Sequence, residues 1–341
     1  MRITICGGGN LGHVCAGFLA AQADHHVSLL TTHPDAWSDA VEVRDGAGQV
    51  FHGRLERVSA HAADVIPGAD IVLVCLPGYA IPNVLESIKD SLEPTTWVGS
   101  VVSSTGFFFE AMKRLPDSQP LFGFQRVPFI SRIIEYGKSA DLKGYKDLLK
   151  VAVEQTGEKE TVRETLERLF HTPVELLGSH YAVSLSNSNP LLHPSRLYTM
   201  WKDWAPGVTY PTRQMFYEEW TVEAAQLLID MDEEFQQLTR RIGLSKDDIV
   251  PILAYYDSTD AVTMTRKIRS IEAFKNIPSP MMETGNGMFI PDLGSRYFTE
   301  DFPFGMRFIV ETARTYSVAV PTIEKVYQWG MKVVAGASEG H

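Results

Sequence analysis

The chain opens with Met1-Arg-Ile-Thr-Ile-Cys-Gly-Gly-Gly-Asn-Leu-Gly12, an apolar strand that runs into the pattern Gly7-x-Gly9-x-x-Gly12. Apolar residues then recur at helical spacing, at Leu11, Val14, Cys15, Phe18 and Leu19. A strand, a glycine-rich turn and a helix in this order are the context of a dinucleotide-binding βαβ unit. The stretch therefore predicts a domain that binds NAD or NADP, although a glycine-rich turn without a ligand is the alternative interpretation.

Each glycine of the pattern has a separate physical reason. Gly7 permits a tight turn, Gly9 lets the backbone approach a pyrophosphate, and Gly12 lets the helix pack close to the strand. Asn10 and Leu11 belong to the first helical turn, whose free N–H groups would receive the negative charge. We expect these five residues to contact the cofactor.

Composition sets the limits for the rest of the chain. A length of 341 residues predicts about two domains, and 44% hydrophobic with 21% charged residues is typical of a globular protein. The formal charge of -11 argues against nucleic-acid or membrane partners. No apolar run approaches the ~20 residues of a membrane span, and no signal peptide precedes the first strand, so a cytoplasmic protein is expected.

Cys6, Cys15 and Cys75 lie in apolar patterns and indicate buried thiols rather than a disulfide or a metal site.

Alternating strand and helix patterns predict an α/β first domain over residues 1–179, with a Rossmann-type doubly wound parallel sheet. Strands are expected at 3–6, 26–30, 71–76, 97–103 and 174–177, and helices at 10–22, 80–91 and 160–170. A hairpin of 41–44 and 50–55 is expected before the strand at 71–76.

The remainder predicts a mainly α-helical substrate domain over residues 180–335 and a frayed tail over 336–341. Helices are expected at 217–242, from Ser245 onward, at 308–316 and at 321–334. A dinucleotide-binding domain followed by a helical one predicts that the substrate lies in a cleft between them.

The end of the second strand bears on cofactor choice. NAD enzymes commonly place an acid there, but this chain has Leu30-Thr31-Thr32-His33. Thr31 and Thr32 either bind a 2′-phosphate or merely cap a loop, and the sequence weakly favours NADP(H) over NAD(H). Leu76 and Pro77 lie at the end of the strand at 71–76, and Ser104 lies directly after the strand at 97–103. These three residues are interpreted as cofactor contacts or as parts of ordinary turns.

Three residues of the second domain suit catalysis. His193 lies in Asn189-Pro190-Leu-Leu-His193-Pro194, where either proline could start a helix whose positive end acts on the imidazole. Arg296 offers a planar fork for a carboxylate, and Asp301 could orient a histidine. An Arg–Asp surface pair is the alternative.

Several blocks together resemble the opine dehydrogenase family, which includes octopine and nopaline dehydrogenases. They are Gly7–Gly12, Phe122-Gly-Phe-Gln125-Arg-Val-Pro128, Ile134-Glu135-Tyr136-Gly137-Lys138, Asn189-Pro190-x-x-His193-Pro194 and Leu293-x-Ser-Arg296-Tyr297-x-Thr-Glu300-Asp301-x-Pro303. The resemblance implies reductive condensation of an amino acid with a 2-keto acid, commonly pyruvate, followed by hydride reduction of the imine.

By position, the resemblance assigns roles to five residues. His193 corresponds to the acid–base histidine, Asp301 to its partner and Arg296 to the carboxylate clamp. Gln125 would face the substrate, and Glu135 would meet a basic amino-acid side chain, unless Glu135 pairs with Arg132 or Lys138.

Two alternatives remain open from the sequence. One is an NAD(P)-dependent 2-keto acid reductase of the ketopantoate reductase type, and the other is a non-catalytic protein that senses a dinucleotide. The amino acid, the keto acid, the stereochemistry of the product and the oligomeric state, with a homodimer among the options, are not determined.

Overall fold

A computed structural model describes residues 1–338 of the chain, which form two compact units. The first unit is Met1–Ser186 and the second begins at Asn187. The division falls after the predicted boundary at Ser179 because helix α6 (His180–Ser184) packs on strands of the first unit. Among the described residues, no helix is both long and apolar enough to cross a membrane.

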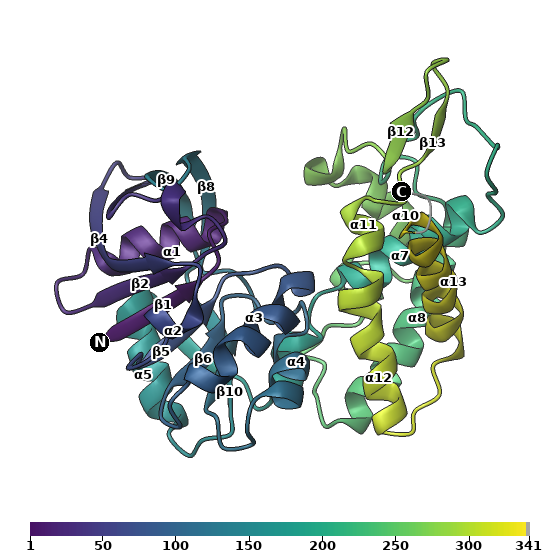
Figure 1. The fold of residues 1–341 in the computed structure, drawn as a ribbon. Coiled ribbons are helices and arrows are strands. Elements are labelled where there is room, and N and C mark those ends of the chain that lie inside the picture. Colours follow the sequence, from purple (N-terminus) through teal and green to yellow (C-terminus); the bar gives the residue numbers. More distant parts are fainter. Residues whose placement is uncertain (339–341) are drawn as a thin grey trace. The chain divides into compact units, whose positions relative to one another are not determined.

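One mixed sheet forms the centre of the first unit, in the order β11-β10-β7-β6-β5-β1-β2-β4-β3-β9-β8 (Figure 1). Its strands are β1 (Arg2–Cys6), β2 (His26–Leu30), β3 (Ala40–Asp45), β4 (Val50–Ser59), β5 (Ile71–Val74), β6 (Trp97–Ser100), β7 (Leu121–Phe124), β8 (Phe129–Glu135), β9 (Ser139–Tyr145), β10 (Leu149–Glu154) and β11 (Val174–Leu176). The run β7-β6-β5-β1-β2-β4 is parallel throughout. The Rossmann-type α/β prediction is therefore confirmed.

The hairpin is more closely joined to this sheet than the sequence predicted. The first half of β4 pairs antiparallel with β3, and its second half pairs parallel with β2. A register shift opposite Val27 and Ser28 lies where the two pairings meet. One long strand therefore serves both the hairpin and the parallel sheet.

Helices cover both faces of the sheet, and two separate apolar clusters form between helices and strands. The helices are α1 (Asn10–Ala20), α2 (Ala62–Val65), α3 (Ile81–Ile88), α4 (Phe107–Arg114) and α5 (Lys159–Phe170), with α6 and the short turns η1 (Pro34–Ala36), η2 (Gly78–Ala80) and η3 (Lys89–Ser91). Cys6, Cys15 and Cys75 are buried free thiols, as predicted.

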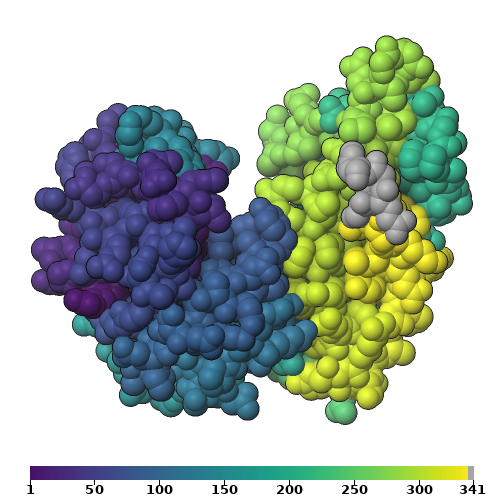
Figure 2. Space-filling view, viewed as in Figure 1, coloured from purple at the N-terminus to yellow at the C-terminus, as the bar shows by residue number. Residues whose placement is uncertain are grey.

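The second unit is mainly helical, as predicted. Its helices are α7 (Asn189–Trp201), α8 (Val222–Arg241), α9 (Ile252–Tyr255), α10 (Ala261–Ser270), η4 (Glu272–Phe274), α11 (Arg296–Thr299), the π-turn η5 (Phe302–Met306), α12 (Arg307–Thr315) and α13 (Pro321–Ser338). A hairpin of β12 (Met281–Glu283) and β13 (Phe289–Pro291) projects from these helices (Figures 1 and 2).

Several predicted boundaries in this unit are wrong for local reasons. Helix α8 begins at Val222 rather than 217, because the Thr221 side chain accepts the N–H of Ala224 and caps the helix there. No regular helix begins at Ser245, because the Asp248 carboxylate bonds both the N–H and the hydroxyl of Ser245 in a turn. The sequence analysis did not predict helix α10.

The predicted tail is partly helical. Helix α13 continues to Ser338, beyond the predicted start of fraying at 336. Residues 339–341 lie outside the described residues.

Candidate active site

The first unit contains a pocket at the carboxyl ends of β1, β2 and β5, with a volume of about 550 Å³. That volume lies within the range of small-molecule sites. Six residues predicted for the cofactor line the pocket: Gly7, Gly9, Thr31, Thr32, Leu76 and Pro77. Open α/β sheets bind their ligands at the carboxyl ends of parallel strands, so this pocket is the candidate dinucleotide site.

The glycine-rich turn has the geometry that a dinucleotide requires. Gly7 has a φ of +119°, and a Cβ there would lie 2.7 Å from the carbonyl oxygen of Cys75. A Cβ on Gly12 would lie 1.9 Å from the carbonyl oxygen of Gly7, so α1 packs directly on the turn. A Cβ on Gly9 would meet nothing within 4 Å, which leaves space for a ligand beside the backbone. The first turn of α1 therefore offers its N–H groups to phosphate oxygens.

The other four residues predicted for the cofactor do not line this pocket. The side chain of Asn10 is used within the protein, because its Oδ1 accepts the N–H of Ile133 at 2.8 Å. Leu11 packs against the core, and Gly12 packs on the turn. Ser104 lies in the turn between β6 and α4. Their contacts with a cofactor stay predictions.

A histidine that the sequence analysis did not single out joins the glycine-rich turn to the β8–β9 turn. His13 is fully buried, and its Nδ1 lies 2.9 Å from the carbonyl oxygen of Gly9. The N–H of Gly137 donates to its Nε2 at 2.7 Å, so the imidazole is neutral with the proton on Nδ1. Burial lowers the pKa of His13. Its ring lies 4.1 Å from Trp37 and 4.9 Å from Tyr136, and Tyr136 lines the pocket.

The end of β2 presents hydroxyl groups to the pocket. Thr31 is buried and Thr32 exposed, and the Thr31 hydroxyl also accepts the N–H of His33 at 3.5 Å. That contact is the loop-capping role that the sequence left open. No Asp or Glu stands among the described residues that line the pocket.

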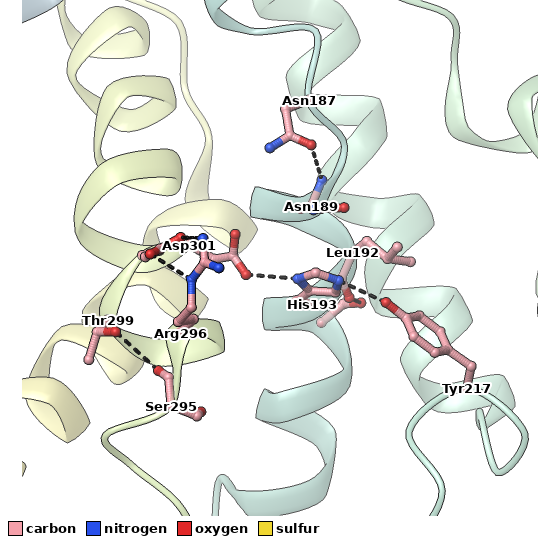
Figure 3. A network of polar contacts seen from close by, with 11 residues as sticks. Asn187, Asn189, Leu192, His193, Tyr217, Ser295, Arg296, Thr299 and Asp301 are labelled. Carbon is pink, nitrogen blue, oxygen red and sulfur yellow. Dashed lines mark hydrogen bonds and ion pairs between the residues drawn. The ribbon is translucent and has the colours of Figure 1, made fainter. Parts of the chain in front are cut away.

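The second unit brings together two residues that are 108 positions apart. Nδ1 of His193 lies 2.7 Å from Oδ2 of Asp301 (Figure 3), and their side chains are only 12% and 15% exposed. His193 lies within α7 and not at a helix start, because Pro190 occupies the first turn and Pro194 is accommodated inside the helix. His193 is thus held on a helix, and the partial burial of the pair makes its hydrogen bond stronger than in water.

Two glycines allow the chain that carries Asp301 to approach α7. Asp301 directly precedes the π-turn η5. A Cβ on Gly305 would lie 2.6 Å from Cγ of Pro190, and a Cβ on Gly330 would lie 2.0 Å from the ring of Phe302. Because neither glycine has a side chain, η5 packs closely against α7 and α13, which brings the carboxylate to the imidazole.

Tyr217 extends this polar chain, and the sequence analysis missed it. Its hydroxyl lies 2.8 Å from Nε2 of His193, and the residue is 5% exposed. The ring stacks on Phe274 at 4.1 Å, and the Nε of Arg196 donates to the carbonyl oxygen of the neighbouring Phe216. Burial raises the pKa of Tyr217 well above its usual value. No local pattern could reveal this contact, because it joins a helix to a turn.

Arg296 forms an ion pair in the structure. Its Nε and Nη2 each donate to a carboxylate oxygen of Glu300 at 2.7 Å, and the arginine side chain is 81% exposed. A surface pair is therefore present, but with Glu300 rather than with the Asp301 that the alternative named. The contact of Arg296 with a substrate carboxylate stays a prediction.

The other two residues predicted to meet a substrate lie in the first unit. Glu135 accepts a hydrogen bond from Lys138 at 2.5 Å, which is one of the two partners left open by the sequence. Gln125 donates from Nε2 to the carbonyl oxygen of Ala182 at 3.3 Å. Contacts of both with a substrate stay predictions.

A dinucleotide-binding sheet and a helical unit with a partly buried His–Asp pair define the class of two-domain dehydrogenases that use a nicotinamide cofactor. Residues 176–334 match the family described as NAD/NADP octopine/nopaline dehydrogenase, alpha-helical domain. Residues 3–124 match ketopantoate reductase PanE/ApbA.

Individual proteins resemble the whole chain. Tauropine dehydrogenase of Arabella iricolor is 28% identical over 97% of this chain and 91% of its own. The structure of octopine dehydrogenase with NADH and L-arginine matches with a TM-score of 0.85 at 24% identity, over 98% of this chain and 90% of that one. Yersinopine dehydrogenase with bound NADP⁺ matches with a TM-score of 0.70 at 14% identity, over 98% and 91%. The resemblance is confirmed: this chain is an NAD(P)-dependent oxidoreductase related to the opine dehydrogenases over nearly its whole length.

Proposed function

We propose that this chain condenses the amino group of an amino acid with a 2-keto acid such as pyruvate and reduces the resulting imine. The observation that carries the proposal is the partly buried His193–Asp301 pair, held at 2.7 Å in the unit that matches the octopine/nopaline dehydrogenases. The glycine-rich pocket of the first unit supports a dinucleotide as the reductant.

The side chains of His193 and Asp301 carry out the proton transfer that accompanies hydride transfer. The bound nicotinamide supplies the hydride. His193 provides a proton where charge develops on the substrate's oxygen or nitrogen. Asp301 accepts the Nδ1–H bond, which orients the imidazole and stabilises its charged form.

Substrate recognition is assigned to three further side chains. Arg296 binds the carboxylate of the keto acid in place of Glu300, because its planar fork suits either carboxylate. Gln125 contacts the substrate, and Glu135 meets a basic side chain when the amino acid has one. Orientation by such contacts contributes to rate as well as to binding.

The proposed cofactor preference is for NADP(H), by a small margin. The hydroxyls of Thr31 and Thr32 can donate to a 2′-phosphate, and no carboxylate repels it among the described residues that line the pocket. Neutral hydrogen bonds of about 0.5–1.5 kcal/mol each support a preference of only about tenfold. Substitution Thr32→Asp should shift kcat/KM toward NADH, because a carboxylate repels the phosphate. Thr161→Asp, an exposed threonine of α5, is the matched control, and an unshifted NADPH/NADH ratio for Thr32→Asp would remove this residue from the cofactor site.

One assay separates the proposed function from its rivals. Oxidation of NADPH and of NADH is followed with pyruvate, with and without a panel of amino acids. We expect turnover to require an amino acid. Equal turnover without any amine would instead indicate a keto-acid reductase, which the match of residues 3–124 to ketopantoate reductase makes the second candidate. Tight cofactor binding without any turnover would indicate a sensor.

A further inference from the structure

One side chain of the dinucleotide pocket comes from a distant part of the sequence. Tyr136 lies in the turn between β8 and β9, and it lines the pocket together with the glycine-rich turn and the end of β2. The other lining residues that the structure describes all lie between Gly7 and Ser87. The β8–β9 hairpin reaches the pocket because it packs beside α1 (Figure 1).

The hydroxyl of Tyr136 lies next to the middle glycine of the turn. A Cβ on Gly8 would lie 3.0 Å from this hydroxyl oxygen and 2.8 Å from Oγ1 of Thr31. Thr31 directly follows β2, and the end of the second strand is where this fold holds the adenosine ribose of a dinucleotide. The Tyr136 hydroxyl is therefore close to the expected position of the ribose 2′ substituent.

This hydroxyl is available to a ligand. Tyr136 is 40% exposed, and no hydrogen bond joins its hydroxyl to any residue in the described part of the chain. A phenol can donate one hydrogen bond. The described residues that line the pocket include no Lys, Arg or His, so an anion bound there depends on neutral donors such as hydroxyl and backbone N–H groups.

The turn that carries Tyr136 is held in place from two sides. The N–H of Gly137 donates to Nε2 of His13 on α1 at 2.7 Å, and the N–H of Ser38 donates to the carbonyl oxygen of Gly137 at 3.0 Å. Gly137 has a φ of +73°, and a Cβ there would lie 2.0 Å from the carbonyl oxygen of Ala36. Because the turn is fixed before any ligand arrives, little conformational entropy is lost when the hydroxyl binds.

We propose that the hydroxyl of Tyr136 donates a hydrogen bond to the phosphate on the adenosine 2′-oxygen of NADP(H), beside Thr31. This role rests on the cofactor preference proposed above. A hydrogen bond to a charged phosphate is stronger than one to a neutral oxygen, and NAD(H) carries only a neutral hydroxyl at that position. Tyr136 therefore helps to select between the two cofactors, from a turn that lies outside the βαβ unit.

The test compares Tyr136→Phe, which keeps the ring and removes the hydroxyl, with Tyr145→Phe. Tyr145 belongs to the same hairpin, is 43% exposed, and donates its hydroxyl to Asp45 rather than to the pocket. The Kd values for NADPH and NADH are measured by fluorescence titration. For Tyr136→Phe, we expect the Kd for NADPH to rise about tenfold or more and that for NADH no more than about threefold. The control should stay within about twofold of wild type for both cofactors.

Two results would overturn the proposal: an unchanged Kd for NADPH in Tyr136→Phe, or an equal loss of affinity for both cofactors. The melting temperature of Tyr136→Phe without ligand should equal that of wild type, because the hydroxyl has no partner among the described residues. A lowered affinity for NADPH then reports a lost contact with the cofactor and not a damaged fold.

A second measurement locates the contact on the cofactor. Calorimetric titrations use adenosine 2′,5′-bisphosphate and AMP, which differ only in the 2′-phosphate. Wild type should bind the bisphosphate more tightly, and Tyr136→Phe should lose most of that difference. Equal binding of the two compounds by wild type, or an undiminished difference in the variant, would contradict the assignment. None of these measurements uses turnover, so if the wild type meets these expectations but turns over no amino acid with pyruvate, the proposed function fails and the role of Tyr136 stands.

Discussion

His193 and Asp301 test the proposed chemistry most directly. His193→Ala removes the proton donor, and Asp301→Asn removes the acceptor that orients it at 2.7 Å. General acid–base catalysis of this kind contributes about 10²–10⁴-fold, so kcat should fall by that order in both variants. Cofactor affinity should hold, because the pocket belongs to the first unit. Steady-state kinetics and a fluorescence titration with NADPH measure the two quantities, and near-wild-type kcat in both variants would refute the assigned pair.

Arg296 tests the recognition of the keto acid. Arg296→Lys keeps the charge but loses the two-pronged geometry seen with Glu300, so we expect KM for the keto acid to rise by about tenfold or more while kcat changes less. Arg314→Lys is a matched control, because Arg314 is also exposed and also donates from Nε and Nη2 to a glutamate, Glu324. An equal KM in the two variants would remove Arg296 from the clamp.

At the scale of elements, His13 couples helix α1 to the turn between β8 and β9. Its folded-state pKa is lowered by burial, below the ordinary 6.5. Below about pH 6.5 the unfolded chain binds a proton that the folded chain does not, so stability falls with decreasing pH by up to about 1.4 kcal/mol per pH unit until the folded pKa is reached. Above about pH 6.5 this contribution is fully present.

Urea unfolding at pH 5.5 and 7.5 measures this dependence in the full-length protein. His13→Gln, which does not titrate, should show a smaller loss of stability on acidification than wild type. His52→Gln is the control, because His52 is 76% exposed. The same acid sensitivity in wild type and His13→Gln would show that His13 is not its source.

At the scale of the whole molecule, the two units are expected to contribute separately to ligand binding. The pocket residues belong to the first unit, and His193, Asp301 and Arg296 to the second. NADPH at 100 times its Kd should stabilise the folded chain by about 2.7 kcal/mol, seen as a raised Tm in thermal unfolding. His193→Ala should show the same rise, because it lies outside the pocket. If NADPH failed to raise the Tm of His193→Ala, the result would contradict separate contributions of the two units to ligand binding.

The amino-acid pattern predicted elements well wherever the cause is local. Helix α1 follows from a glycine-rich turn and apolar spacing, and α12 and α13 from the same periodicity. The errors arose where short side-chain contacts override that periodicity: the Thr221 cap delays α8, and the Ser245–Asp248 contact replaces a helix with a turn.

The sequence by itself determined the cofactor-binding fold and, through family motifs, nominated His193, Arg296 and Asp301. Only the tertiary structure decided which of these meet. His193 contacts Asp301 and Tyr217 across 108 and 24 positions, whereas Arg296 pairs with Glu300 one helical turn away. Glycine turns and helical spacing are local properties that a sequence displays directly. Contacts at long separation depend on how α7, η5 and the turn before α8 pack together, and that packing is specified by side-chain volumes from the whole unit.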